Sequence, residues 1–123
     1  MYLIDTNILI PAIAQKEPDY SFLQKIISKN QLYLSVICIG EYLSKATVEE
    51  ESEIDKLIHN FPLLSVDLNT ARLAASYRKK FWKARRILLL GYFLAAQAKL
   101  NDLTLVTHNK SDFPMKDIRI ITP

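Results

Sequence analysis

Short apolar runs alternate with longer segments of helical periodicity from one end of the chain to the other, and this alternation constrains the fold most. Each apolar run is long enough for a buried strand, and apolar residues recur every three or four positions in the segments between them. Strands separated by helices form parallel sheets, because the chain must cross over before the next strand starts. The sequence therefore predicts an α/β fold, a three-layer sandwich with a mostly parallel central sheet flanked by helices.

The expected elements can be placed on the sequence. The predicted strands are Tyr2–Asp5, Gln31–Val36, Leu63–Val66, Leu103–Thr107 and Ile118–Ile121. The predicted helices are Ile8–Ala14, perturbed by Pro11, then Tyr20–Ser28, Ile39–Thr47, Glu50–Asn60, Asn69–Lys83, capped by Asn69 or Thr70, and Tyr92–Leu100.

Length and composition exclude several classes of protein. The 123 residues suit a single domain, 1–123, and the only two glycines exclude a glycine-rich phosphate loop. Cys38 is the only cysteine, which excludes an intramolecular disulfide and a cysteine zinc cluster and favours a reducing, cytoplasmic setting. No apolar stretch is long enough to span a membrane. The net charge of +3 permits an acidic partner without requiring one.

Three acidic residues fall where strands of the predicted sheet end. Asp5 ends the first strand, Glu41 lies early in the helix after the second, and Asp112 follows Leu103–Thr107 through a turn. Ligands bind at the carboxyl ends of parallel strands, and two carboxylates about 4 Å apart repel by roughly 4 kcal/mol at an effective dielectric of 20. Such an oxygen-only cluster suits Mg²⁺ or Mn²⁺, which can activate water for phosphodiester hydrolysis.

Each acid also has a simpler interpretation. Asp5 or Thr6 can cap the helix that follows. Glu41 can be a solvated helix residue, and Asp112 can satisfy backbone amides of its own turn. The convergence of the three depends on the parallel topology.

At this point the chain resembles a PIN-domain ribonuclease of the VapC toxin type. The resemblance covers nearly the whole chain, and the order and spacing of its segments make it specific. The matching segments are Leu3-Ile4-Asp5-Thr6-Asn7, Leu34-Ser35-Val36 leading to Glu41-Tyr42-Leu43, Leu94-Ala95-Ala96-Gln97-Ala98 and Leu105-Val106-Thr107-His108-Asn109-Lys110-Ser111-Asp112-Phe113.

The resemblance implies a magnesium- or manganese-dependent endoribonuclease that acts on RNA. It assigns metal binding and catalysis to Asp5, Glu41 and Asp112, and supporting roles to Thr6 and Asn109. It also implies a small antitoxin protein as partner and a homodimer.

One position departs from the family pattern. The family usually has an Asp just before the Leu-Ala-Ala helix, where this chain has Gly91, a residue that can cap the helix but supplies no ligand. Asp102 cannot replace that acid, because it lies at the far end of the helix. Two readings follow: a ribonuclease impaired by Gly91, or a non-catalytic PIN-like module that binds RNA or protein.

A basic stretch leads to Gly91. On one reading its cations track phosphates and its aromatic rings stack on bases, with Arg85 and Arg86 beside the acids as RNA-binding residues. On the other reading it is a solvated helix end whose cations suit the helix dipole and whose aromatic rings pack inward. The stretch comprises Arg78, Lys79, Lys80, Lys83, Arg85 and Arg86 around Phe81 and Trp82.

The remaining residues of interest have plain expectations. Cys38 is expected to be a small buried apolar residue, and His59 a surface residue. His108 stands beside Asn109, and we expect it to be a solvated loop histidine.

Overall fold

The structure is a computed structural model that describes residues 1–83 and 88–123. Within these residues five strands form one sheet in the order β3-β2-β1-β4-β5. All four neighbouring pairs are parallel, which confirms the predicted topology. The strands are β1 (Tyr2–Ile4), β2 (Leu32–Ser35), β3 (Leu63–Leu64), β4 (Thr104–Val106) and β5 (Arg119–Ile121).

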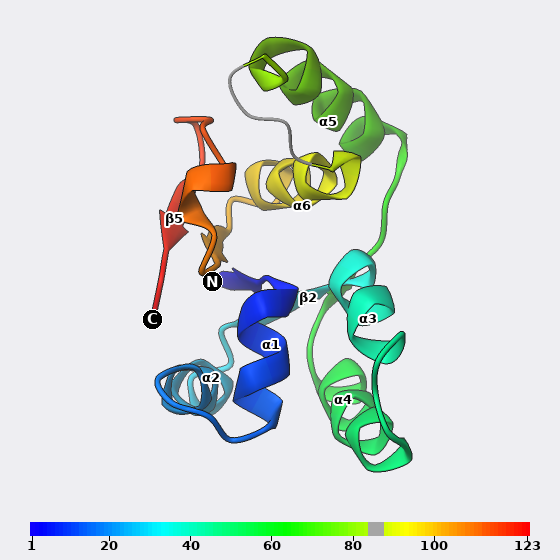
Figure 1. The fold of residues 1–123 in the computed structure, drawn as a ribbon, viewed down its shortest axis with the longest axis vertical. Coiled ribbons are helices and arrows are strands. Elements are labelled where there is room, and N and C mark those ends of the chain that lie inside the picture. Colours follow the sequence, from blue (N-terminus) through cyan, green and yellow to red (C-terminus); the bar gives the residue numbers. More distant parts are fainter. Residues whose placement is uncertain (84–87) are drawn as a thin grey trace.

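Helices cover both faces of this sheet, so the predicted three-layer arrangement is also confirmed. Figure 1 shows α1 to α4 on one side of the strands and α5 and α6 on the other. In the part of the chain that the structure describes, no helix is both long and apolar enough to cross a membrane. The helices are α1 (Thr6–Ile13), α2 (Asp19–Ser28), α3 (Val36–Leu43), α4 (Val48–Asn60), α5 (Leu68–Phe81), α6 (Leu89–Leu100) and the 3-10 helix η1 (Lys110–Asp112).

The pleat of the strands divides the core into two layers. Leu3 and Leu105 pack with the side chains of α5 and α6, whereas Ile4 and Val106 pack with those of α1, α2 and α4. Successive residues of a strand point to opposite faces, which is why neighbours in sequence enter different layers. Burying a Leu, Ile or Val side chain contributes about 1.5–3 kcal/mol, and these four are fully buried.

The observed elements differ from the predicted ones mainly at their ends. The strands are shorter than predicted, while α3 begins at Val36 rather than at residue 39, because the Ser35 hydroxyl accepts a hydrogen bond from the Ile37 amide and caps the helix. The predicted caps of α5 are wrong: Asp67 caps the helix and accepts from the Thr70 amide at 2.8 Å. The predicted cap of α6 is wrong as well, since Leu88 occupies that position and Gly91 is the third helical residue.

These connections place polar residues at one edge of the sheet. Asp5 is the single residue between β1 and α1, and α3 follows β2 without a loop. Thr107 directly follows β4, the strand that pairs with β1. Side chains from distant parts of the sequence therefore meet at the carboxyl ends of β1 and β4.

Candidate active site

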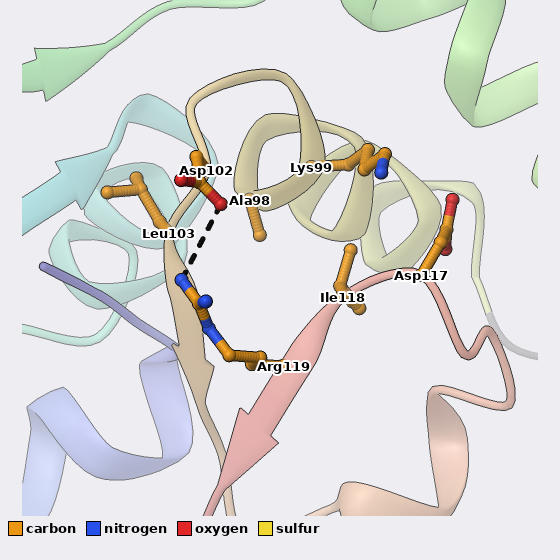
Figure 2. A pocket seen from close by; sticks show the side chains of 7 residues that line it. All are labelled: Ala98, Lys99, Asp102, Leu103, Asp117, Ile118 and Arg119. Atoms are coloured by element: carbon orange, nitrogen blue, oxygen red, sulfur yellow. Dashed lines mark ion pairs between the residues drawn. The ribbon is translucent and has the colours of Figure 1, made fainter.

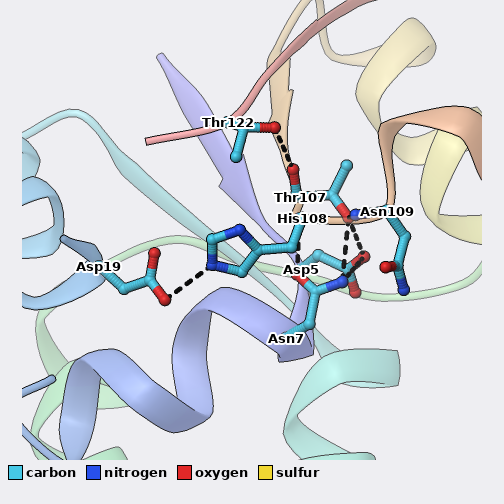
Figure 3. A network of polar contacts seen from close by, with 7 residues as sticks. All are labelled: Asp5, Asn7, Asp19, Thr107, His108, Asn109 and Thr122. Atoms are coloured by element: carbon cyan, nitrogen blue, oxygen red, sulfur yellow. Dashed lines mark hydrogen bonds and ion pairs between the residues drawn. The ribbon is translucent and has the colours of Figure 1, made fainter. Parts of the chain in front are cut away.

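Asp5 is held by donors from three directions at the carboxyl end of β1. Its Oδ1 accepts a hydrogen bond from the Thr6 amide at 2.7 Å, which caps α1. Its Oδ2 accepts from the Thr107 hydroxyl at 2.8 Å and, more weakly, from the Asn7 side-chain amide at 3.5 Å. Figure 3 shows Asn7 and Thr107 gathered around the carboxylate. Because both oxygens are engaged, the plane of the Asp5 carboxylate is fixed, yet Oδ1, with a single donor among the described residues, keeps room for another partner.

The electrostatic environment of Asp5 opposes its charge. Burial raises the pKa of Asp5 above its ordinary value of 3.8, and the hydrogen bonds from Thr107 and Thr6 lower it. The negative charges of Glu41 and Asp112 raise the pKa further. The structure thus brings Glu41 and Asp112 within electrostatic reach of Asp5.

Glu41 joins this group through Thr6. It lies on α3 with an exposed side chain, and its Oε1 accepts a hydrogen bond from the Thr6 hydroxyl at 3.1 Å. Thr6 itself is buried and donates its amide to Asp5. The supporting position predicted for Thr6 therefore corresponds to a residue that contacts two of the acids.

Asp112 lies in η1, a short helix in place of the expected turn. The amide of Asp112 donates to the backbone oxygen of Asn109, and the amide of Asn109 donates to the Thr107 hydroxyl at 3.1 Å. Asn109 is thus tied to the site through its backbone amide. In this way η1 is linked to the residue that holds Asp5.

The chemistry of this donor set suits a hard divalent cation. All three acids offer oxygen ligands, and their mutual repulsion is relieved by a positive charge. As they stand, however, no three His, Cys, Asp or Glu side chains among residues 1–83 and 88–123 are grouped closely enough to hold a metal ion. The residues therefore fit the ion by chemistry, while binding it would require the carboxylates to draw together.

Two residues of this site have roles that their sequence neighbourhood does not show. Thr107 is fully buried, and its hydroxyl also accepts from the Asn7 side-chain amide at 3.1 Å. Asn7 in turn accepts from the His108 amide at 3.0 Å. The signal available in the sequence was position alone, since Thr107 follows the end of β4 by one residue and Asn7 follows the end of β1 by three.

His108 departs from the solvated loop residue that we expected. Its ring is exposed over about a third of its area, but Nε2 lies 2.8 Å from Oδ2 of Asp19, a buried carboxylate at the start of α2. Figure 3 shows the ring turned away from Asp5 and toward Asp19. Cys38 and His59 match their expectations, the first buried and the second exposed.

The basic stretch is only partly described. Arg85 and Arg86, the predicted RNA-binding residues, lie outside the described residues. The Arg78 guanidinium stacks on the ring of Trp82 at 4.3 Å from its centroid, and Trp82 is 36% exposed. Phe81 packs partly buried against the core. One aromatic ring thus packs inward and the other lies at the surface beneath a cation.

A small cavity lies at the opposite edge of the sheet, by the amino ends of β4 and β5. Figure 2 shows Asp102 and Arg119 facing each other there, with an ion-pair distance of 3.5 Å. The cavity of about 90 Å³ combines cations and anions, with Lys99 and Asp117 also in its lining. Asp102 therefore lies far along α6 from Gly91, in agreement with the expectation that it cannot replace an acid at that position.

Known proteins are similar to this chain over nearly its whole length. The sequence profile described as PIN domain matches residues 2–118. Ribonuclease VapC10 of Mycobacterium tuberculosis is 27% identical over 116 residues, which are 94% of this chain and 87% of that protein.

Solved structures share the fold. The crystal structure of VapBC2 from Rickettsia felis, bound to a DNA fragment from its promoter, matches with a TM-score of 0.82 and 21% identity, over 99% of this chain and 98% of that chain. A toxin-antitoxin complex from Klebsiella pneumoniae matches with a TM-score of 0.81 and 22% identity, over 100% and 98% of the two chains.

Proposed function

The chain belongs to the PIN-domain family, and from that premise we propose that it is a metal-dependent endoribonuclease of the VapC toxin type. The observation that carries the proposal is the state of Asp5. A carboxylate is fixed by hydrogen bonds at the carboxyl edge of a parallel sheet, within electrostatic reach of Glu41 and Asp112. The name of the relative VapC10, a ribonuclease, supports RNA as the substrate.

In this proposal Asp5, Glu41 and Asp112 hold Mg²⁺ or Mn²⁺. When bound, a divalent ion lowers the pKa of a water and neutralises a phosphodiester oxygen. Thr107 and Asn7 keep the Asp5 carboxylate in one orientation, and the Thr6 hydroxyl holds Glu41 beside it. Asn109 supports the site by fixing the Thr107 hydroxyl through its amide.

Partners follow from the same family. We expect a small antitoxin protein that covers the site, supported by the solved relatives with this fold, which are described as VapBC and toxin-antitoxin complexes. Homodimerisation is also expected. Large apolar side chains stand exposed and suit burial by such partners, among them Leu68 at 65% and Leu88 at 79% exposure.

Gly91 favours a second candidate function. Gly91 supplies no ligand at the start of α6, and the described acids are not grouped as a metal shell. Both observations favour a PIN-like module that binds RNA or protein without cleaving it. The two candidates differ in their need for metal, because a binding module holds its partner equally well in a chelator.

Cleavage of a labelled RNA by the parent and by Gly91→Asp, with Mn²⁺ and with chelator, tests both. Asp at the third position of α6 places its charge at the favourable end of the helix dipole and adds one oxygen ligand. We expect Gly91→Asp to bind Mn²⁺ more tightly and cleave faster than the parent. Ser52→Asp is the matched control, since it adds the same charge at an exposed position of α4.

The outcomes separate the candidates. Cleavage that requires Mn²⁺ and is lost with Asp5→Asn supports the enzyme. Cleavage only by Gly91→Asp identifies an impaired enzyme. If neither form cleaves, and the parent retains RNA in chelator, the chain is a binding module. If Gly91→Asp binds Mn²⁺ no better than Ser52→Asp, Gly91 does not occupy the missing ligand position.

A further inference from the structure

We propose that Asp19 and His108 form a positioning pair, which fixes the turn after β4 so that Thr107 and Asn7 hold the Asp5 carboxylate. The effect of the pair on metal binding rests on the proposed function. Its effect on the orientation of Asn7, Thr107 and Asp5 does not. Neither residue touches Asp5; both act through the residues between them.

The pair is buried on one side. The Asp19 side chain is only 5% exposed, and its Oδ2 lies 2.8 Å from Nε2 of His108. Its other oxygen, Oδ1, is buried without a hydrogen-bond partner in the described residues. Burying a carboxylate is unfavourable unless it is paired, so His108 is the contact that makes this position tolerable. An ionised carboxylate can only accept, so this contact is a hydrogen bond in the tautomer that carries its proton on Nε2.

A continuous set of contacts leads from this pair to Asp5. The His108 ring is anchored on α2, and its backbone amide donates to Oδ1 of Asn7 at 3.0 Å. Nδ2 of Asn7 then donates to the Thr107 hydroxyl at 3.1 Å, and that hydroxyl donates to Asp5 at 2.8 Å. Figure 3 shows these residues side by side, with Asp19 at one end and Asp5 at the other.

The geometry also explains why the anchor is needed. Thr107, His108 and Asn109 follow the end of β4, and the backbone bond to β5 there runs from the Thr107 amide to the Ile121 carbonyl at 3.1 Å. Another tie holds the backbone there, from the Thr122 hydroxyl to the Thr107 carbonyl at 2.7 Å. The His108 ring adds a contact with Asp19 at the start of α2. The turn is therefore held by α2 on one side and by the residue after β5 on the other. Groups that bond a metal ligand directly, as Thr107 does Asp5, typically change metal affinity 10–100-fold when removed. His108 acts through Asn7 and Thr107, so its effect should lie at the lower end of that range or below it.

The test compares His108→Ala with His108→Gln, whose amide restores an N–H donor toward Asp19. His59→Ala is the matched control, since His59 is the chain's other histidine and is exposed on α4. In metal-free protein, ¹⁵N NMR follows the Asn7 side-chain amide and the exchange of the Thr6 amide. Calorimetric titration then measures Mn²⁺ affinity.

We expect His108→Ala to shift the Asn7 amide signals, speed exchange at Thr6 and weaken Mn²⁺ binding by up to about 10-fold. His108→Gln should recover most of each effect, and His59→Ala should show none. In an Asp19→Ala background, His108→Ala should add nothing further, because the two residues act as one unit.

Two results would overturn the proposal. One is a His108→Ala protein that melts earlier but keeps the parent's Asn7 signals and Mn²⁺ affinity, since the pair would then serve stability alone. The other is a failure of His108→Gln to recover any effect. If the parent binds no Mn²⁺, the metal part of the proposed function fails, while the metal-free signals of Asn7 and Thr6 still decide for or against the pair.

Discussion

Replacing Thr107 by Val isolates the hydroxyl on which the site depends. Val has nearly the same shape, so the fully buried position gains no cavity and loses only polar contacts. The hydroxyl donates to the Asp5 carboxylate and accepts from the Asn7 amide and the Asn109 backbone. A hydrogen bond to a charged group contributes about 1.5–3 kcal/mol and a neutral one about 0.5–1.5 kcal/mol.

These contacts share one oxygen, so their contributions overlap, and we expect a loss of about 2–4 kcal/mol in the free energy of unfolding. The 123 residues of the chain imply an unfolding entropy of about 0.26 kcal/mol/K, so the melting temperature should fall by about 8–15 °C. Thr107→Ser keeps the hydroxyl and removes one methyl group, for a loss of about 1 kcal/mol.

The loss in free energy of unfolding caused by Thr107→Val should depend on pH in a defined direction. The pKa of Asp5 is raised by burial and lowered by the Thr107 hydroxyl, so Thr107→Val raises it further above 3.8. A buried carboxyl with a raised pKa destabilises the fold most when it is ionised, and protonation relieves that effect. The difference in free energy of unfolding between parent and variant should therefore be largest at neutral pH. It should narrow as the pH falls through the raised pKa of Asp5 in the folded variant and then through that in the folded parent, toward 3.8.

Urea unfolding across this pH range measures the effect. Thr104→Val is the control, because Thr104 lies on β4, the strand that Thr107 follows, and within residues 1–83 and 88–123 its hydroxyl bonds only the exposed Arg119 side chain. Its effect should stay within about 0.5 kcal/mol at every pH. A Thr107→Val protein that loses less than about 1 kcal/mol, or loses the same amount at all pH values, would refute the reasoning.

Three further predictions concern single residues. Asp5→Asn should abolish Mn²⁺-dependent cleavage while raising the free energy of unfolding at neutral pH, because it removes a charge that burial and its neighbours disfavour; urea unfolding that shows a loss instead would contradict this. The thiol of Cys38 is buried and burial raises its pKa to about 12, so iodoacetamide should modify it only after unfolding, as mass spectrometry can follow. Ile54→Ala should cost about 2–5 kcal/mol in urea unfolding, whereas Val48→Ala on the same helix should have little effect, since Val48 is 79% exposed.

The sheet could be predicted from the sequence because its signals are local. The spacing of apolar residues within a short segment predicts each strand and helix, and the alternation of strands and helices predicts parallel pairing. The convergence of Asp5, Glu41 and Asp112 then follows from topology, and the structure places Glu41 and Asp112 where they act on the pKa of Asp5. Their role as metal ligands stays a prediction.

The contacts that hold the site could not be predicted in the same way. Thr107 and Asp5 are 102 residues apart, and His108 and Asp19 are 89 apart, so each contact depends on the register between strands and on helix placement. Local propensity also gave a wrong prediction at Val36, which was placed at the end of a strand because valine favours strands. There the Ser35 cap started a helix instead, which moved Glu41 from its expected place in the first turn to the second.

Asp5 raised two interpretations, a helix cap or a partnered functional acid, and the structure shows that they are compatible. The cap uses Oδ1 alone, through the Thr6 amide. Capping does not explain the charge, because Ser or Asn caps a helix as well as Asp does and would avoid the burial and repulsion that raise the pKa of Asp5. Nor does it explain the Thr107 hydroxyl, which holds Oδ2, the oxygen that the cap leaves unused. A partly buried, oriented carboxylate that is kept near two others, although this raises its pKa, suits a cation-binding site. Asp5→Asn separates the two roles because it keeps the cap and removes the charge.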